Sequence, residues 1–215
     1  MPKKLLAPPR WITKPLQGIT FWIGHRRSLY SGYPLPEAAL VAELCNIIFT
    51  HKESDQVLKC EVQYASLLSR EVEPNDYMTA KARADIVIYR KTARKKDGPQ
   101  PEVIIEVKRS KAAAKQINND LLRLAEVKRQ HPNIKAYLIV ISESHRPARF
   151  VDSNGFAIAR TYRIPSTNQL YRVRRVAKAA SAFTKKDTAQ YACLIEVSMP
   201  MLPVELRGYR TWSSK

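Results

Sequence analysis

The sequence predicts an α/β protein in which a mixed β-sheet is flanked by helices. Two observations carry this prediction. Along residues 35–142 the apolar pattern changes in the order helix, strand, strand, strand, helix, strand. The chain also has 215 residues, of which 45% are hydrophobic. This is an ordinary composition for a folded protein, and the length suits one large domain or one domain with an extension.

Two segments have the spacing of amphipathic helices. Residues 35–51 form the first, and Pro36 fits its first turn because a missing N–H costs nothing there. Residues 110–131 form the second, with Ser110 as a plausible N-cap and Pro132 as a stop. The apolar positions that define the two helices are Leu40, Leu44, Ile47 and Ile48, then Ile117, Leu121, Leu124 and Val127.

Four segments read as strands because they are rich in β-branched residues and bounded by turn residues. They are residues 57–68, 84–89, 102–108 and 136–142. A charged turn containing Gly and Pro joins the second to the third, so that pair should be antiparallel. The long helix between the third and the fourth predicts a parallel pair joined by a right-handed crossover.

The remaining residues flank this core, which we place at residues 34–145. Residues 1–33 contain several prolines and are expected to be a basic, irregular arm or lid. Residues 146–215 are rich in arginine and are expected to form a basic C-terminal α/β extension packed on the core. Three aromatic residues of the arm should pin it to the core rather than stack on bases: Trp11, Trp22 and Tyr30.

The charge of the chain indicates a polyanionic partner. It has 37 Lys and Arg against 19 Asp and Glu, a net charge of +18 and a pI near 10.0. Nucleic acid is favoured over a membrane, because the basic residues do not gather on one amphipathic helix. A solvated basic face is the alternative for about half of them. The residues expected to contact nucleic acid are Arg90, Lys91, Arg94, Lys95, Lys96, Arg109, Lys111, Arg172, Arg174 and Arg175.

Cysteine usage and the N-terminus indicate a cytoplasmic protein. Cys45, Cys60 and Cys193 lie far apart in the sequence, no pair has zinc-finger spacing, and an odd number suits free thiols in a reducing compartment. The first residues are basic and broken by proline, without the apolar core of a secretory signal. No apolar run approaches the roughly 20 residues that span a bilayer.

Charged residues in the predicted strands mark the candidate site. Glu106 and Lys108 share one face of their strand because side chains alternate with period two. An ionised acid in a buried strand costs several kcal/mol unless it is paired or bound to metal. Asp85 opens the neighbouring apolar strand and has the same problem. If these two carboxylates meet, each raises the pKa of the other.

A hard divalent cation would relieve this repulsion, since Mg²⁺ is held by one or two carboxylates together with waters and phosphate oxygens. A lysine beside the ion can orient or deprotonate the attacking water, or can hold a phosphate. The alternative is an ion pair between Glu106 and Lys108 on an exposed strand face, worth about 0–1 kcal/mol.

Asp85 followed by the run Glu106-Val107-Lys108, then a helix and a strand, resembles the PD-(D/E)XK nuclease superfamily. The resemblance covers roughly residues 36–142 and implies a restriction-endonuclease-like fold. It implies that Asp85 and Glu106 bind Mg²⁺ or Mn²⁺, that the Val107 carbonyl completes the metal shell, and that Lys108 assists the water.

Two further positions follow from the resemblance. The acid that this superfamily often carries on the preceding helix best fits Glu43, with Glu37 as the alternative. Gln116 matches the glutamine of the following helix. Asp120 stands where one exonuclease branch has tyrosine, and Ala84 where many members have proline. For Glu43 and Gln116 the alternative is an ordinary surface position.

The expected function is therefore a metal-dependent nuclease, most simply a DNA endonuclease in restriction, anti-phage defence or mobile-element processing. DNA is favoured over RNA because most of the resembling superfamily cuts DNA. A homodimer or a subunit of a larger complex is expected. The alternatives are a non-catalytic nucleic-acid-binding module that keeps the fold and a basic scaffold subunit.

Overall fold

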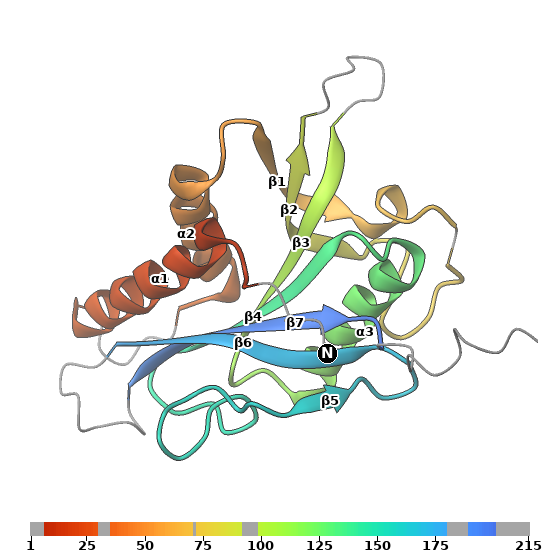
Figure 1. The fold of residues 1–215 in the computed structure, drawn as a ribbon. Helices are drawn as coiled ribbons and strands as arrows, with labels where there is room; N and C mark the ends of the chain where they lie inside the picture. The colour runs from red at the N-terminus through yellow and green to blue at the C-terminus, as the bar shows by residue number, and fades with distance from the viewer. Residues whose placement is uncertain (1–6, 30–34, 71, 92–98, 180–188, 201–215) are drawn as a thin grey trace, which may run out of the picture.

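The computed structural model describes residues 7–29, 35–70, 72–91, 99–179 and 189–200. Within these residues the chain has an α/β fold in which a seven-stranded mixed sheet is flanked by three α-helices. Figure 1 shows α1 and α2 beside each other on one face of the sheet and α3 on the other. The expected α/β class with a mixed sheet is confirmed.

The helices are α1 (Arg10–Leu29), α2 (Glu37–His51) and α3 (Ala114–Gln130), with a short 3₁₀ turn η1 (Tyr64–Ser66). The strands are β1 (Gln56–Gln63), β2 (Arg83–Arg90), β3 (Gln100–Arg109), β4 (Lys135–Ser142), β5 (Thr161–Arg163), β6 (Leu170–Ala179) and β7 (Gln190–Ser198). The order from α2 to β4 is the order predicted from the apolar pattern.

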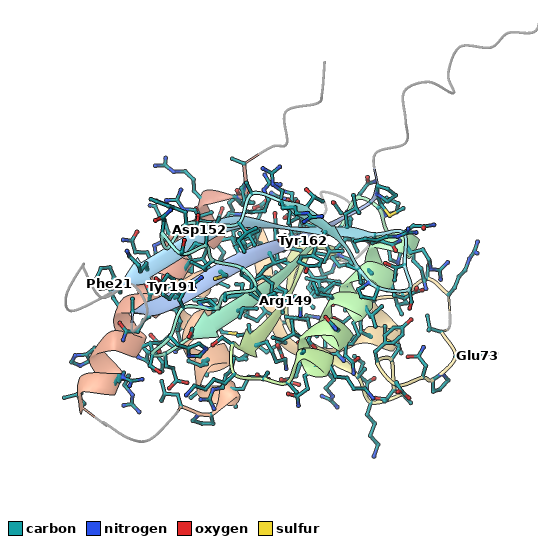
Figure 2. All side chains as sticks on the ribbon, turned by 90° about the horizontal axis from the view of Figure 1, so that it is seen from below. Phe21, Glu73, Arg149, Asp152, Tyr162 and Tyr191 are labelled. Carbon is teal, nitrogen blue, oxygen red and sulfur yellow. The ribbon has the colours of Figure 1, made fainter. Side chains whose placement is uncertain are left out.

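The strands lie side by side in the order β1-β2-β3-β4-β7-β6-β5. β3 and β4 are parallel, and every other neighbouring pair is antiparallel. The antiparallel hairpin β2–β3 and the parallel pair on either side of α3 are both confirmed. α3 crosses one face of the sheet (Figure 2), where it packs against β4 and β7 and also reaches β3.

Strands β2 and β3 separate near the predicted site. Pairing between β2 and β3 runs only as far as Ile86 opposite Ile105. Beyond that point β2 remains paired with β1 down to Arg83, while β3 remains paired with β4 up to Arg109. Backbone groups that a continuous ladder would satisfy are thus left to side chains, and polar residues are required there.

Each face of the sheet has its own apolar core. Alternate residues of the central strands pack under α1 and α2, including Ile105, Val107 and Ile139. The intervening residues pack under α3, including Ile104 and Leu138. This alternation is the period-two pattern of a sheet that is covered on both faces.

The expectation of an irregular N-terminal arm is wrong for residues 10–29, which form α1. Its apolar residues recur at helical spacing and are buried against α2 and the sheet: Trp11, Ile12, Leu16, Ile19 and Ile23. Pro15 lies within the helix and removes one backbone donor. Burial of the apolar stripe outweighs this loss. Trp11 pins the segment as expected, whereas Tyr30 lies outside the described residues.

Two boundaries also differ from the predictions. The N-cap of α3 is Ala113 rather than Ser110, whose hydroxyl instead lies 3.0 Å from His145 Nε2. β1 ends at Gln63 and continues as η1, so residues 57–68 are not one strand.

The segment expected to be a C-terminal extension continues the same sheet as β5, β6 and β7. β7 pairs directly with β4 and carries buried residues on both faces, such as Cys193 and Leu194. These described residues therefore contribute to the central core.

Replacing Leu16 by alanine tests whether α1 belongs to the core. Leu16 is fully buried, so the change should lower the free energy of unfolding by about 2–5 kcal/mol in urea denaturation. Gln17→Ala, at the exposed neighbouring position, should change it by no more than about 0.5 kcal/mol. Equal, small effects of both changes would mean that this helix is a loosely attached arm.

Candidate functional site

Glu106 and Lys108 share one face of β3, as predicted, and this is the face covered by α3. They lie opposite Leu138 and Val140 of β4, whose side chains belong to the core under α3. Val107 points to the opposite face and packs under α1 and α2. The acid and the lysine are therefore set between the sheet and the first half of α3, where the sheet divides.

Lys108 is held by carboxylates from two helices. Its Nζ lies 2.6 Å from Glu37 Oε1 at the start of α2 and 3.5 Å from Asp120 Oδ2 of α3. Burial lowers the pKa of Lys108, but the charges of Asp120 and Glu37 outweigh burial, and the pKa is raised above its usual value. The amine is an ammonium at neutral pH, which suits positioning and charge stabilisation rather than proton abstraction.

Glu106 is an almost fully buried acid, with 2% of its surface exposed. Its Oε1 accepts hydrogen bonds from the Tyr64 hydroxyl at 2.5 Å and from Arg123 Nε at 3.2 Å. Burial raises its pKa well above the usual range, and the charges of Asp85 and Asp120 raise it further. The expected mutual effect of Asp85 and Glu106 is thus present, although burial is the larger cause.

Asp85 fills the division between β2 and β3. Its Oδ2 accepts a hydrogen bond of 2.7 Å from the Val107 N–H, a backbone donor that β2 no longer satisfies. Burial raises the pKa of Asp85 despite this bond and the nearby charge of Lys108. The aspartate replaces a missing ladder hydrogen bond and brings its negative charge beside Glu106.

Asp120 is a site residue that the sequence reasoning named only as a departure from a family pattern. It is 1% exposed and forms an ion pair with Arg123 through Oδ1, while Oδ2 has no hydrogen-bond partner. Burial raises its pKa to about 6. The available signal was its position between Ile117, Leu121 and Leu124, on the apolar stripe of α3, where an acid is unexpected.

Arg123 was also missed, although it is the second cation of the cluster. Its guanidinium contacts Glu106 and Asp120 together and donates to the Tyr77 carbonyl. The charges of Glu106 and Asp120 outweigh the effect of burial and raise its pKa.

The resulting charge cluster consists of Glu37, Asp85, Glu106, Asp120, Lys108 and Arg123. Four carboxylates minus two cations leave a formal charge of −2 when all the groups are ionised. Burial is the main cause of the raised pKa values of Asp85, Glu106 and Asp120, and the neighbouring carboxylates raise these pKa values further.

The donor set fits a hard divalent cation in chemistry, because it offers carboxylate oxygens and a formal charge of −2. Asp120 Oδ2 is a buried oxygen that makes no hydrogen bond and lies 3.5 Å from the Lys108 ammonium, and it could bind such an ion in place of that ammonium. In the described part of the chain, however, no three His, Cys, Asp or Glu side chains are arranged to hold a metal as they stand. The Lys108 ammonium lies between Glu37 and Asp120, so metal binding requires side-chain rearrangement.

Two site residues expected from the resemblance lie elsewhere. Glu37 contacts Lys108, whereas Glu43, the preferred candidate, lies half-buried further along α2. Gln116 is exposed, and its Oε1 accepts the Ala113 N–H at 3.2 Å, so it caps α3. Position 37 is favoured because the N-terminus of α2, rather than its middle, faces the end of β3. Glu37 Oε2 also accepts the Arg109 N–H.

For Arg90 and Lys91, the expectation that the basic β2–β3 hairpin flanks the site is wrong. They lie at the end of β2 away from the site, and Arg90 is five residues from Asp85, about 17 Å along the strand. Arg90 is also paired with three acids: Glu53, Asp55 and Glu102. Lys91 is exposed, and Arg94, Lys95 and Lys96 lie outside the described residues.

The other basic candidates fall into two groups. Arg109 and Lys111 directly follow Lys108 at the end of β3; Arg109 pairs with Glu143 at 2.9 Å, and Lys111 is exposed. On β6, Arg174 is paired with Glu196, while Arg172 is half-exposed and Arg175 exposed. Only the first group is adjacent in sequence to the charge cluster.

Comparison of the chain with protein-family models, curated proteins and solved structures finds no match. Across the described ranges, no helix has the length and apolar character needed to cross a membrane. The function is accordingly argued from the charge cluster and its surroundings.

Replacing Asp120 by asparagine tests whether its ionised carboxylate destabilises the metal-free cluster. A folded-state pKa of about 6 against an unfolded value of 3.8 means that the contribution of Asp120 to stability is present below pH 3.8 and lost as pH rises towards 6. Asparagine does not ionise, so the variant does not lose stability for this reason as pH rises. Between pH 4 and pH 7 the stability of the variant relative to wild type should therefore rise by about 1–3 kcal/mol.

The measurement is urea denaturation at several pH values in the presence of a chelator. Asp76→Asn is the matched control, since that aspartate is 84% exposed, and it should show no such trend. A variant that becomes progressively less stable than wild type as pH rises would mean that Lys108 and Arg123 fully compensate Asp120.

Proposed function

We propose that this protein is a metal-dependent nuclease that hydrolyses phosphodiester bonds, and that its core has a restriction-endonuclease-like fold. One observation carries the proposal. Four carboxylates from four different elements, α2, β2, β3 and α3, converge around two cations in a chain whose net charge is +18. A protein with this surplus of basic residues does not need acids for solubility. Gathering four of them, with Glu106 and Asp120 buried, therefore calls for a specific role.

The cluster divides into groups with different roles. Asp85 and Asp120, with Glu106, would hold Mg²⁺ or Mn²⁺; the Val107 carbonyl is a further donor. A bound divalent ion supplies Lewis-acid activation of a phosphate oxygen or a water. Arg123 and Tyr64 orient Glu106 through the bonds described above. Glu37 orients Lys108.

Lys108 acts as a fixed positive charge. Its ammonium can hold a phosphate oxygen or a water lone pair at the end of β3, and its raised pKa argues against its acting as the base. The proton of the attacking water must then pass to a carboxylate. Asp120 is proposed as this carboxylate, because burial raises its pKa and its Oδ2 makes no hydrogen bond and lies beside the Lys108 ammonium.

Nucleic acid is the proposed substrate because charge-driven binding to phosphates follows from the basic surface. Arg109 and Lys111 extend the positive charge from Lys108. From the resemblance in the sequence we also propose DNA rather than RNA as the substrate, a role in restriction, anti-phage defence or mobile-element processing, and action as a homodimer or within a complex. A cytoplasmic location is proposed from the cysteine usage and the N-terminal sequence.

A second candidate is a non-catalytic nucleic-acid-binding or scaffold subunit with the same fold. The observation that favours it is the pairing of Lys108 with Glu37 and of Glu106 with Arg123, together with the lack of a ready metal-binding trio among the described residues. In that case the cluster would be a structural ion network, and nucleic acid would bind without being cut.

Cleavage assays separate the two candidates. Purified protein is incubated with supercoiled, linear and single-stranded DNA and with RNA, in Mg²⁺ or in chelator. We expect Mg²⁺-dependent cutting that falls about 100-fold or more in Lys108→Ala, because a fixed charge at the reacting phosphate is lost. The affinity of Lys108→Ala for nucleic acid, measured in the presence of chelator, should change little.

A matched pair of variants tests the choice of helix acid. Glu37→Gln should lower the cleavage rate roughly 10–100-fold, since it releases Lys108. Glu43→Gln, on the same helix, should leave the rate close to wild type. Wild-type cutting by both Lys108→Ala and Asp85→Ala would show that the activity lies elsewhere. Binding without cutting of any substrate would favour the scaffold candidate.

A further inference from the structure

Cys45 and Cys60 lie against each other although fifteen residues separate them. Their Sγ atoms are 3.2 Å apart, one on α2 and the other on the edge strand β1. Figure 1 shows α2 running beside this end of the sheet. No sequence pattern indicated this pair, because the spacing of the cysteines matches no metal motif. The third cysteine, Cys193, is buried in β7.

The two thiols differ in access. Cys60 is exposed, whereas Cys45 is half-buried between α2 and the sheet. Burial, then the contact with Cys60, raises the pKa of the Cys45 thiol, and the charges of Asp85 and Glu61 add to this. A reagent from solution therefore meets Cys60 first, with Cys45 placed behind it as the only cysteine within reach among the described residues.

Little movement separates these thiols from a covalent bond. A disulfide has a sulfur–sulfur distance of about 2.05 Å, so the two atoms need to approach by roughly 1.2 Å. The exposed side chain of Cys60 is the more accessible of the two for such a movement.

We propose that Cys45 and Cys60 are an oxidative modification site that forms an intramolecular disulfide by exchange with a small-molecule disulfide of the glutathione class. The Cys60 thiolate attacks one sulfur of the reagent, and the other leaves as a thiolate that takes up a proton. Cys45 then loses its proton and attacks the Cys60 sulfur, which releases the second small thiol. The cysteine pair loses two electrons and two protons, and the reagent gains them.

The bond would join the two elements next to the charge cluster. α2 carries Glu37 at its N-terminus, and Cys60 lies opposite Ile86, the residue after Asp85. Oxidation would thus fix α2 to the part of the sheet that supplies Asp85. The inference rests on the thiol geometry and holds whether or not the cluster binds metal.

The test is oxidation of the full-length native chain with oxidised glutathione, followed by intact-mass measurement and peptide mapping. We expect the mass of two hydrogens to be lost and a Cys45–Cys60 cross-link to appear. The cross-link should form roughly tenfold or more faster than in concentrated urea, since folding holds the thiols together. It should raise the Tm, and a dithiol reductant should reverse both changes.

Variants define the order of attack. Cys45→Ser should accumulate a glutathione adduct on Cys60, because the resolving thiol is absent, while Cys193→Ser should cross-link like wild type. Wild-type protein that keeps a stable adduct on Cys60, forms disulfide-linked dimers, or cross-links no faster when folded than in urea would overturn the proposal. The wild-type mapping alone decides the question if a serine variant fails to fold.

Discussion

The contact between Lys108 and the carboxylates around it is the constraint on which the rest of the site depends. Each buried carboxylate costs several kcal/mol in lost hydration, and removing one partner of such a pair costs about 3–5 kcal/mol. Lys108 and Arg123 offset this cost for the buried Glu106 and Asp120 only while β3 and α3 hold their places, and the half-exposed Glu37 ties α2 to the same lysine. The positions of α2, β3 and α3 therefore depend on the same set of ion pairs. In that set the carboxylates outnumber the cations.

Apolar burial elsewhere in the fold offsets the free-energy cost of burying these charged groups. One core, under α1 and α2, backs the reverse face of the strands that carry the acids. The other surrounds the cluster under α3. The division between β2 and β3 gives up ladder hydrogen bonds, and Asp85 recovers one of them through the Val107 N–H. A local loss of regular pairing is what lets an acid enter the sheet.

The sequence predicted the parts that follow from periodicity. The α2-to-β4 order, the antiparallel hairpin, the parallel β3–β4 pair and the shared face of Glu106 and Lys108 needed only local patterns. α1 was missed because its prolines were given more weight than its apolar spacing. Asp120, Arg123 and the choice of Glu37 over Glu43 depend on how α2 and α3 pack against the sheet, and no local pattern contains that information.

The central claim is that the cluster is short of positive charge and takes up one divalent cation. The most direct measurement is titration of the protein with Mn²⁺, following the spectrum of free Mn²⁺ by electron paramagnetic resonance. The account predicts one saturable site that Mg²⁺ competes for, that Asp85→Asn removes and that Glu43→Gln keeps. A wild-type chain that leaves all the Mn²⁺ free, or an Asp85→Asn variant that binds it equally well, would contradict the account.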